Sequence, residues 1–207
     1  MDDTLGAGKL LVKAEELNPD SSDTQIIIGE MMRREGNLDE AEARYRRALE
    51  LSPGSAEARL NLGVIQGQKG NLDAALEEFR IVAADDKFEH RDLAHDNIGQ
   101  ICLERKDLDC AEKEFREAVT LNDRYARSQA NLGRVLYMRK NDQAAAQHLE
   151  AAVELDPKFA GARYDLALVY VRLGRRADAI AELRNVLRMT PKGTYAHDAR
   201  EELALLE

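Results

Sequence analysis

Residues 126–159 read ARSQANLGRVLYMRKNDQAAAQHLEAAVELDPKF, and the small residues of this stretch decide the fold. Gly133 is followed twelve positions later by Ala145, and Leu149 comes four positions after that. Pro157 closes the stretch. A glycine facing an alanine lets two antiparallel helices approach closely, the larger residue fills space toward the next pair, and the proline stops the second helix. The stretch therefore predicts a helical hairpin.

The same spacing recurs along the chain with a period of about 34 residues, which makes the hairpin a repeating unit. The first-helix small residues are Gly29, Gly63, Gly99, Gly133 and Ala167, and their second-helix partners are Ala41, Ala75, Ala111, Ala145 and Ala179. The predicted repeats are 22–55, 56–89, 92–125, 126–159 and 160–193, in a single domain of residues 1–207. Between the second and third repeats the period stretches by two residues around Phe88. This stretch is either a tolerated loop insertion or a device that presents Phe88 to a partner.

Both ends of the chain depart from the full repeat. Residues 1–21 match only the second helix of a repeat, with Leu11 and Leu17 at its apolar positions. We expect a half repeat there, and we expect sequence upstream of it to have been removed. Residues 194–207 form one more amphipathic helix, of the kind that caps a stack of repeats with a polar outer face.

The repeated residues resemble those of the tetratricopeptide-repeat family, and the resemblance covers nearly the whole chain. It implies an all-α fold, namely a right-handed superhelical solenoid of helix-turn-helix repeats with a C-terminal capping helix. The chain departs from the family at the large aromatic place near the start of each first helix. That place holds Gln25, Arg59, His95, Gln129 and Arg163. We expect this departure to weaken individual repeats slightly.

Composition and motifs argue against several classes of function. The formal charge of −9 disfavours general affinity for nucleic acid, because phosphate binding needs clustered Lys and Arg. No apolar run approaches the roughly 20 residues that span a bilayer. The four histidines have no metal-binding spacing, and no catalytic motif or cofactor loop is present. We expect no enzyme activity, no metal, no cofactor and no direct membrane span.

Cys102 and Cys110 leave two interpretations open. Cys102 falls late in a first helix and Cys110 falls at the start of the following second helix, so antiparallel packing brings them to the same level. A disulfide needs Cα atoms within about 7 Å and would indicate an oxidising compartment. The alternative is a pair of small apolar residues in a reduced cytoplasmic protein.

The family resemblance implies that first helices line a concave groove that holds a protein or peptide segment. Carried onto this chain, the groove places are unusually apolar, and such a strip usually marks an interaction site. Alternatively, some of these residues pack on neighbouring helices, or a terminal extension fills the groove. The principal candidates for partner binding are Leu60, Asn61, Val64, Asn97, Asn131, Arg134, Tyr137, Met138, Tyr164 and Leu168, and the same places hold Ile26, Ile27, Glu30, Arg33 and Arg172.

Two patterns sharpen the groove hypothesis. Asn61, Asn97 and Asn131 recur at the sixth place of three repeats, where carboxamides either pair with the backbone of an extended peptide or are simply solvated. Arg127, Arg134 and Arg172 add positive charge that would favour an acidic segment. The Lys and Asn carboxylate clamp of family co-chaperones is absent, which disfavours the tails of heat-shock proteins.

The third repeat carries a narrower resemblance. The segments 88–91, 97–103 and 111–119 look like the middle repeats of type IV pilus pilotin lipoproteins. That family implies a protein at the periplasmic face of the outer membrane that assists secretin assembly, which requires a signal peptide and a lipidated cysteine upstream. The alternative is a cytoplasmic adaptor or scaffold in a multiprotein complex.

Overall fold

The computed structural model describes residue 18 and residues 20–207, and within these it contains eleven α-helices and no strand. The all-α fold class is thereby confirmed. Leu11 and Leu17, on which the predicted half repeat depends, lie outside the described residues.

The helices begin and end close to the places that the repeat pattern predicts. They are α2 (Ser22–Arg34), α3 (Leu38–Leu51), α4 (Ala56–Gln68), α5 (Leu72–Ala83), α6 (Arg91–Glu104), α7 (Leu108–Leu121), α8 (Ala126–Met138), α9 (Asp142–Leu155), α10 (Ala160–Arg172), α11 (Arg176–Met189) and α12 (Ala196–Leu206). Packing divides the chain into two units that meet in sequence within α6, between Ile98 and Gly99.

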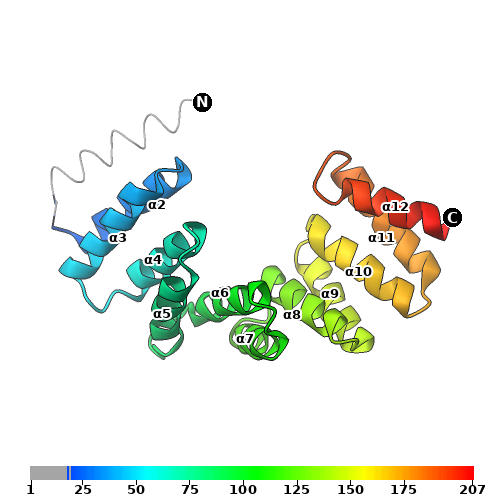
Figure 1. Cartoon of the computed structure of the whole chain (residues 1–207), viewed down its shortest axis with the longest axis horizontal. Coiled ribbons are helices and arrows are strands. Elements are labelled where there is room, and N and C mark those ends of the chain that lie inside the picture. The colour runs from blue at the N-terminus through cyan, green and yellow to red at the C-terminus, as the bar shows by residue number, and fades with distance from the viewer. Residues whose placement is uncertain (1–17, 19) are drawn as a thin grey trace. The chain divides into compact units, whose positions relative to one another are not determined.

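In the first unit, consecutive helices form hairpins (Figure 1). Helix α2 packs against α3, α4 packs against α5, and α3 also contacts α4. The core between them is built on the fully buried Tyr45 with Ile65, Leu62 and Ile26, together with several alanines. The hydrophobic effect thus acts between neighbouring hairpins and requires no central core.

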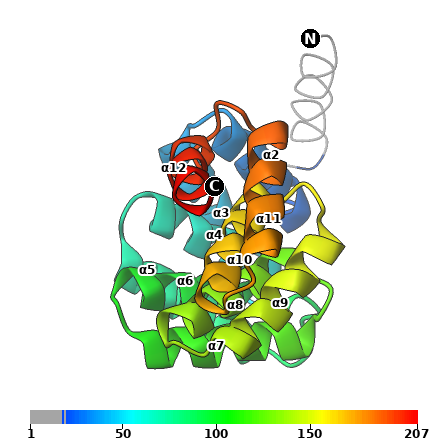
Figure 2. The same ribbon diagram turned by 90° about the vertical axis from the view of Figure 1, so that its right-hand side faces the viewer.

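The second unit repeats this arrangement and ends in the cap. Helix α8 packs against α9 and α10 against α11, while α7 contacts α8 and α9 contacts α10. Helix α12 packs on α11 (Figure 2). Its Ala199 joins a core cluster with Ala167, Leu183 and Val186.

Glycine on the first helix permits the close approach within a hairpin. A Cβ atom added at Gly63 would lie 2.6 Å from the Phe79 ring, and one added at Gly99 would lie 2.6 Å from the Phe115 ring. Real Cβ atoms essentially never come that close. The Gly and Phe places of the repeat therefore fit together as a pair.

The turn between the two helices of a repeat needs a residue with positive φ. Gly36, Gly70 and Gly174 supply it, with φ between 73° and 83°. Lys106 and Lys140 occupy the same place in the third and fourth repeats, with φ of 60° and 62°. Lysine adopts this left-handed conformation at a steric cost that glycine does not have.

Polar side chains take over the structural role at the place where the family has an aromatic residue. The guanidinium of Arg59 donates to Glu78 of the second helix at 3.0 Å and to the carbonyl of Pro53 in the preceding loop at 3.2 Å. Arg163 makes the same two contacts, to Glu182 and Pro157. Gln129 likewise contacts His148 and the carbonyl of Asp123. In these three repeats the hydrogen bonds tie the hairpin to the loop that enters it.

Candidate functional site

A pocket of about 530 Å³ opens between the first helices of the first two repeats. Its lining comprises Ile26, Ile27, Glu30, Met31, Arg33 and Arg34 from α2, and Glu57 and Asn61 from α4. Five of these residues are at places that the family resemblance assigns to the groove. We call this site the α2–α4 pocket.

The α2–α4 pocket combines an apolar wall with a fixed charge cluster. Ile27 is 50% exposed, which is high for an isoleucine. The Glu30 carboxylate accepts hydrogen bonds from Arg33 at 2.7 and 2.9 Å and from Arg34 at 2.9 Å. The hydrogen bond from Arg33 lowers the pKa of Glu30, although burial opposes the shift. The charges of Glu30, Arg33 and Arg34 are thus paired with one another at the rim, while Ile27 forms an apolar wall.

Helix α4 contributes polar groups to the pocket that no described residue engages. Asn61 is half-buried, and within the described part of the chain its carboxamide makes no hydrogen bond. Glu57 is exposed and forms no ion pair with any described residue. A carboxamide both donates and accepts, so Asn61 can pair with a ligand group of either kind.

Other predicted groove residues of the first unit have different environments. Leu60 is only 8% exposed, which is similar to the 6% of the pocket-lining Ile26, because burial of apolar side chains is favourable on folding. Val64 is half-buried. The amide nitrogen of Asn97 donates to the carbonyl of Leu93 in its own helix at 2.8 Å, which engages one of its donors.

In the second unit, the predicted groove residues Arg134 and Asn131 are engaged within the protein. Arg134 pairs with Asp165 of α10, with nitrogen–oxygen distances of 2.7 and 2.8 Å, and also interacts with Tyr195. Burial raises the pKa of the Asp165 carboxyl, and the Arg134 charge opposes this shift. Asn131 is 5% exposed. The expected positive charge of Arg134 is therefore compensated internally.

Tyr164 was predicted to contact a partner, and in the structure it is half-buried beside Tyr195. The two rings lie 5.4 Å apart between centroids, and Tyr195 comes from the segment that precedes α12. A Cβ atom added at Gly161 would lie 3.0 Å from the Tyr195 hydroxyl oxygen. Tyr195 therefore lies across the start of α10, which corresponds to the alternative in which a terminal segment fills the groove.

Tyr137, Met138 and Leu168 remain accessible to different extents. Met138 is 50% exposed, whereas Tyr137 and Leu168 are half-buried. The Arg172 guanidinium lies 4.0 Å above the Tyr137 ring and also pairs with Asp142. The Arg172 charge is thus shared between an aromatic face and a carboxylate.

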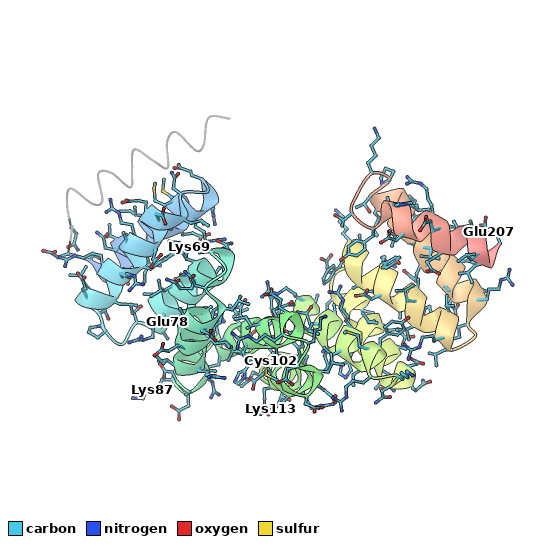
Figure 3. All side chains as sticks on the ribbon, in the orientation of Figure 1. Lys69, Glu78, Lys87, Cys102, Lys113 and Glu207 are labelled. Carbon is cyan, nitrogen blue, oxygen red and sulfur yellow. A yellow bond between two sulfur atoms is a disulfide. The ribbon has the colours of Figure 1, made fainter. Side chains whose placement is uncertain are left out.

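Cys102 and Cys110 form a disulfide in the structure, with a Cα–Cα distance of 5.8 Å (Cys102 is labelled in Figure 3). It joins the end of α6 to the start of α7. In the part of the chain that the structure describes, no group of three or more His, Cys, Asp or Glu side chains could hold a metal ion. No described helix is both long and apolar enough to cross a membrane.

Sequence reasoning missed Met31, Arg34 and Glu57 in the pocket, and it missed Tyr195. Met31 and Arg34 follow Ile27 and Glu30 by four residues, so helical periodicity could have placed them on the same face. The position of Tyr195 depends on how the cap folds back, and no periodic signal encodes that.

Comparisons with known proteins agree with this geometry. Tetratricopeptide repeat models match residues 33–90 and 93–158, and a further one matches residues 142–203. Among curated proteins, none matches the chain significantly.

Solved structures with the same fold include three whose lengths are close to that of this chain. YrrB, described as a protein of this repeat type with an unusual peptide-binding site, has 24% identity and a TM-score of 0.66, covering 92% of this chain and 97% of its own. The pilF protein of Pseudomonas aeruginosa has 20% identity and a TM-score of 0.86, covering 97% and 90%. PilW, a type IV pilus biogenesis factor, has 17% identity and a TM-score of 0.81, covering 96% and 91%.

Proposed function

Because the chain belongs to the tetratricopeptide repeat family, we propose that it is a non-enzymatic scaffold that holds an extended protein segment against its first helices. The observation that carries this proposal is the α2–α4 pocket, where the half-exposed Ile27 stands beside an unengaged carboxamide, Asn61. An apolar wall with a few oriented polar groups is typical of a binding site for a protein segment. The segment binds as an extended chain and undergoes no reaction.

We further propose that the protein acts in type IV pilus biogenesis as a pilotin that assists assembly of the outer-membrane secretin. The motif of the third repeat supports this role, as does the likeness in fold to PilW and pilF. The Cys102–Cys110 disulfide supports it independently, because disulfides persist in oxidising compartments such as the periplasm. In this proposal the secretin supplies the segment that enters the groove.

A binding measurement with the secretin of the source organism tests the scaffold function. The parent chain and an Ile27→Ser variant are titrated with the purified secretin. We expect the variant to bind at least about tenfold more weakly, which corresponds to about 1.4 kcal/mol, because the substitution removes apolar contact area. Ile81→Ser is the matched control, since Ile81 is 45% exposed and lies on α5, outside the pocket. Equal weakening by both substitutions would rule out the pocket as the binding site.

Deletion of the gene tests the pilus role separately. We expect the deletion strain to lose assembled secretin from its outer membrane, and we expect the parent gene, but not the Ile27→Ser gene, to restore it. Normal secretin assembly in the deletion strain would refute the pilotin role. The cytoplasmic adaptor would then be the remaining interpretation, and it predicts that the chain keeps its thiols reduced in the cell.

A further inference from the structure

The α2–α4 pocket has a counterpart in the second unit. Helices α2 and α4 are the first helices of consecutive repeats, and so are α8 and α10. Counted from the helix starts, Glu30 corresponds to Arg134, Glu57 corresponds to Gly161, and Asn61 corresponds to Asp165. The repeat positions that line the open pocket of the first unit therefore carry other side chains in the second unit.

In the second unit this place is occupied by a tyrosine of the chain itself. Tyr195 lies against Gly161, stacks beside Tyr164, and interacts with Arg134, which is in turn paired with Asp165. Gly161 is what admits the ring, because a Cβ atom there would come within 3.2 Å of two ring carbons and 3.0 Å of the hydroxyl oxygen. The protein thus shows which kind of side chain this place in the repeat can hold.

The lining of the α2–α4 pocket suits the same kind of side chain. Ile27 and Met31 offer an apolar surface, and a thioether packs favourably against an aromatic ring. The Arg33 guanidinium at the rim can lie over a ring face. Asn61 offers both a donor and an acceptor that no described residue uses. The volume of about 530 Å³ leaves room for one large side chain and part of its backbone.

We propose that the α2–α4 pocket receives a tyrosine side chain of the partner segment, in the way that the equivalent place of the second unit receives Tyr195. This inference rests on the proposed scaffold function and names the side chain that the scaffold recognises. The ring packs on Ile27 and Met31, and the hydroxyl group exchanges a hydrogen bond with the Asn61 carboxamide. A carboxylate in the same place would be repelled by Glu57.

Single amino-acid amides test the pocket without any knowledge of the partner. N-acetyl-tyrosinamide, N-acetyl-phenylalaninamide and N-acetyl-leucinamide are titrated into the full chain while the methyl NMR signals of Ile27 and Met31 are followed. We expect saturating shifts with the tyrosine amide at about millimolar concentration, the affinity typical of a ligand of this size. The phenylalanine amide should bind severalfold more weakly and the leucine amide more weakly still. Absence of saturating shifts, or equal affinity for all three amides, would overturn the proposal.

Substitutions separate the ring contact from the hydroxyl contact. Ile27→Ser should weaken the tyrosine and phenylalanine amides equally. Asn61→Ala should remove the preference for tyrosine while leaving the affinity for phenylalanine unchanged. Ile81→Ser should leave both affinities unchanged. A tyrosine preference that survives Asn61→Ala would refute the role of Asn61.

The counterpart in the second unit provides a gain-of-function test. Tyr195→Ala should create a second site for the tyrosine amide, seen as new shifts of the Met138 methyl group, because Met138 occupies the position that corresponds to Arg34 in the α2–α4 pocket. Circular dichroism verifies that the variant is folded, and Tyr195→Phe, which keeps the ring in place, should open no second site. A folded Tyr195→Ala variant with no second site would refute the equivalence of the two places. If the amides fail to bind but Ile27→Ser still weakens the secretin, the scaffold function stands and only the tyrosine assignment is wrong.

Discussion

At the scale of single residues, the turns of the third and fourth repeats carry backbone strain that the other turns avoid. Lys106 and Lys140 adopt the left-handed conformation that Gly36, Gly70 and Gly174 adopt without steric cost. The left-handed conformation costs a non-glycine residue roughly 1–2 kcal/mol. The two lysine turns are therefore places where one substitution can raise stability.

We predict that Lys140→Gly raises the free energy of unfolding by about 1 kcal/mol, because relief of strain exceeds the added entropy of the unfolded chain. Urea denaturation followed by circular dichroism measures the change. Gln147→Gly is the matched control, since Gln147 is exposed in the interior of α9 in the same hairpin. It should lower stability by about 1 kcal/mol. Loss of stability with Lys140→Gly would contradict the strain argument.

At the scale of helices, polar pairs replace the aromatic residue that the family has near the start of each first helix. The pair of Arg163 and Glu182 is more buried than that of Arg59 and Glu78, with side chains 14% and 17% exposed against 26% and 22%. Arg163 also donates a hydrogen bond to the carbonyl of Pro157, so it joins both helices of its repeat to the loop that precedes them.

A double-mutant cycle with Arg163→Ala and Glu182→Ala should give a coupling free energy of about 1 kcal/mol, at the upper end of the range for exposed ion pairs, because this pair is partly buried. Thermal and urea denaturation of the four proteins supply the values. The pair Arg47 and Glu50, which is largely exposed within α3, serves as the comparison and should couple less. Coupling near zero at both pairs would show that these hydrogen bonds do not stabilise the hairpin.

Glu42 of α3 connects neighbouring hairpins through hydrogen bonds. Its carboxylate accepts hydrogen bonds from Gln66 of α4 at 2.8 Å and from Lys69, the residue that follows α4, at 2.8 Å. The hydrogen bond from Lys69 and those from Arg46 and Gln66 lower the pKa of Glu42 from 4.5 to about 2. Glu42 therefore stays ionised in the folded protein at pH values where the unfolded chain binds a proton.

This shift predicts a pH dependence. The stabilisation by Glu42 is fully present above pH 4.5 and is lost as the pH falls toward about 2, because the lowered pKa belongs to the folded state. At pH 7, Glu42→Gln should cost about 1 kcal/mol after allowance for solvent screening. The difference between parent and variant should shrink between pH 4.5 and pH 2 in urea denaturation. A difference that is independent of pH across this window would contradict the prediction.

Much of the helix arrangement could be predicted because it depends on small and large residues that pack together at a fixed, short separation in the sequence. The spacing of Gly63 and Ala75 predicts that the two helices of the hairpin approach closely. The ring that packs against Gly63 is nevertheless that of Phe79, whose place the sequence had assigned to the space toward the next hairpin. The environment of Tyr164 could not be predicted, because it depends on how the segment around Tyr195 folds back. The burial of Leu60 could not be predicted either, since the same position of the repeat is buried at Leu60 and half-buried at Tyr164.

At the scale of the whole chain, repeat proteins gain stability from each hairpin and from each interface between neighbours. A constraint on one hairpin therefore affects the hairpins beside it. The Cys102–Cys110 disulfide is such a constraint, since it closes a short loop between α6 and α7.

Reduction of this disulfide should lower the free energy of unfolding by about 2.5 kcal/mol, from the loop-closure entropy for a sequence separation of 8. Urea denaturation with and without reductant measures the change, and thiol titration of the denatured, non-reduced protein should find no free thiol. The variant with both Cys102→Ala and Cys110→Ala should be insensitive to reductant. Two free thiols in protein folded under oxidising conditions would contradict the bond and would remove its support for a periplasmic location.

The local character of the packing also bears on how the protein is made. The helix pairs that pack extensively are neighbours in the chain, and α2 and α4, which are one helix apart, make only a small contact. Proteins whose contacts are local fold quickly, on microsecond to millisecond timescales. Synthesis adds only roughly 5–20 residues per second, so each hairpin has time to form before the next one leaves the ribosome. Within each unit, the chain can therefore assemble in the order of its synthesis, with a completed hairpin serving as the surface on which the next one folds.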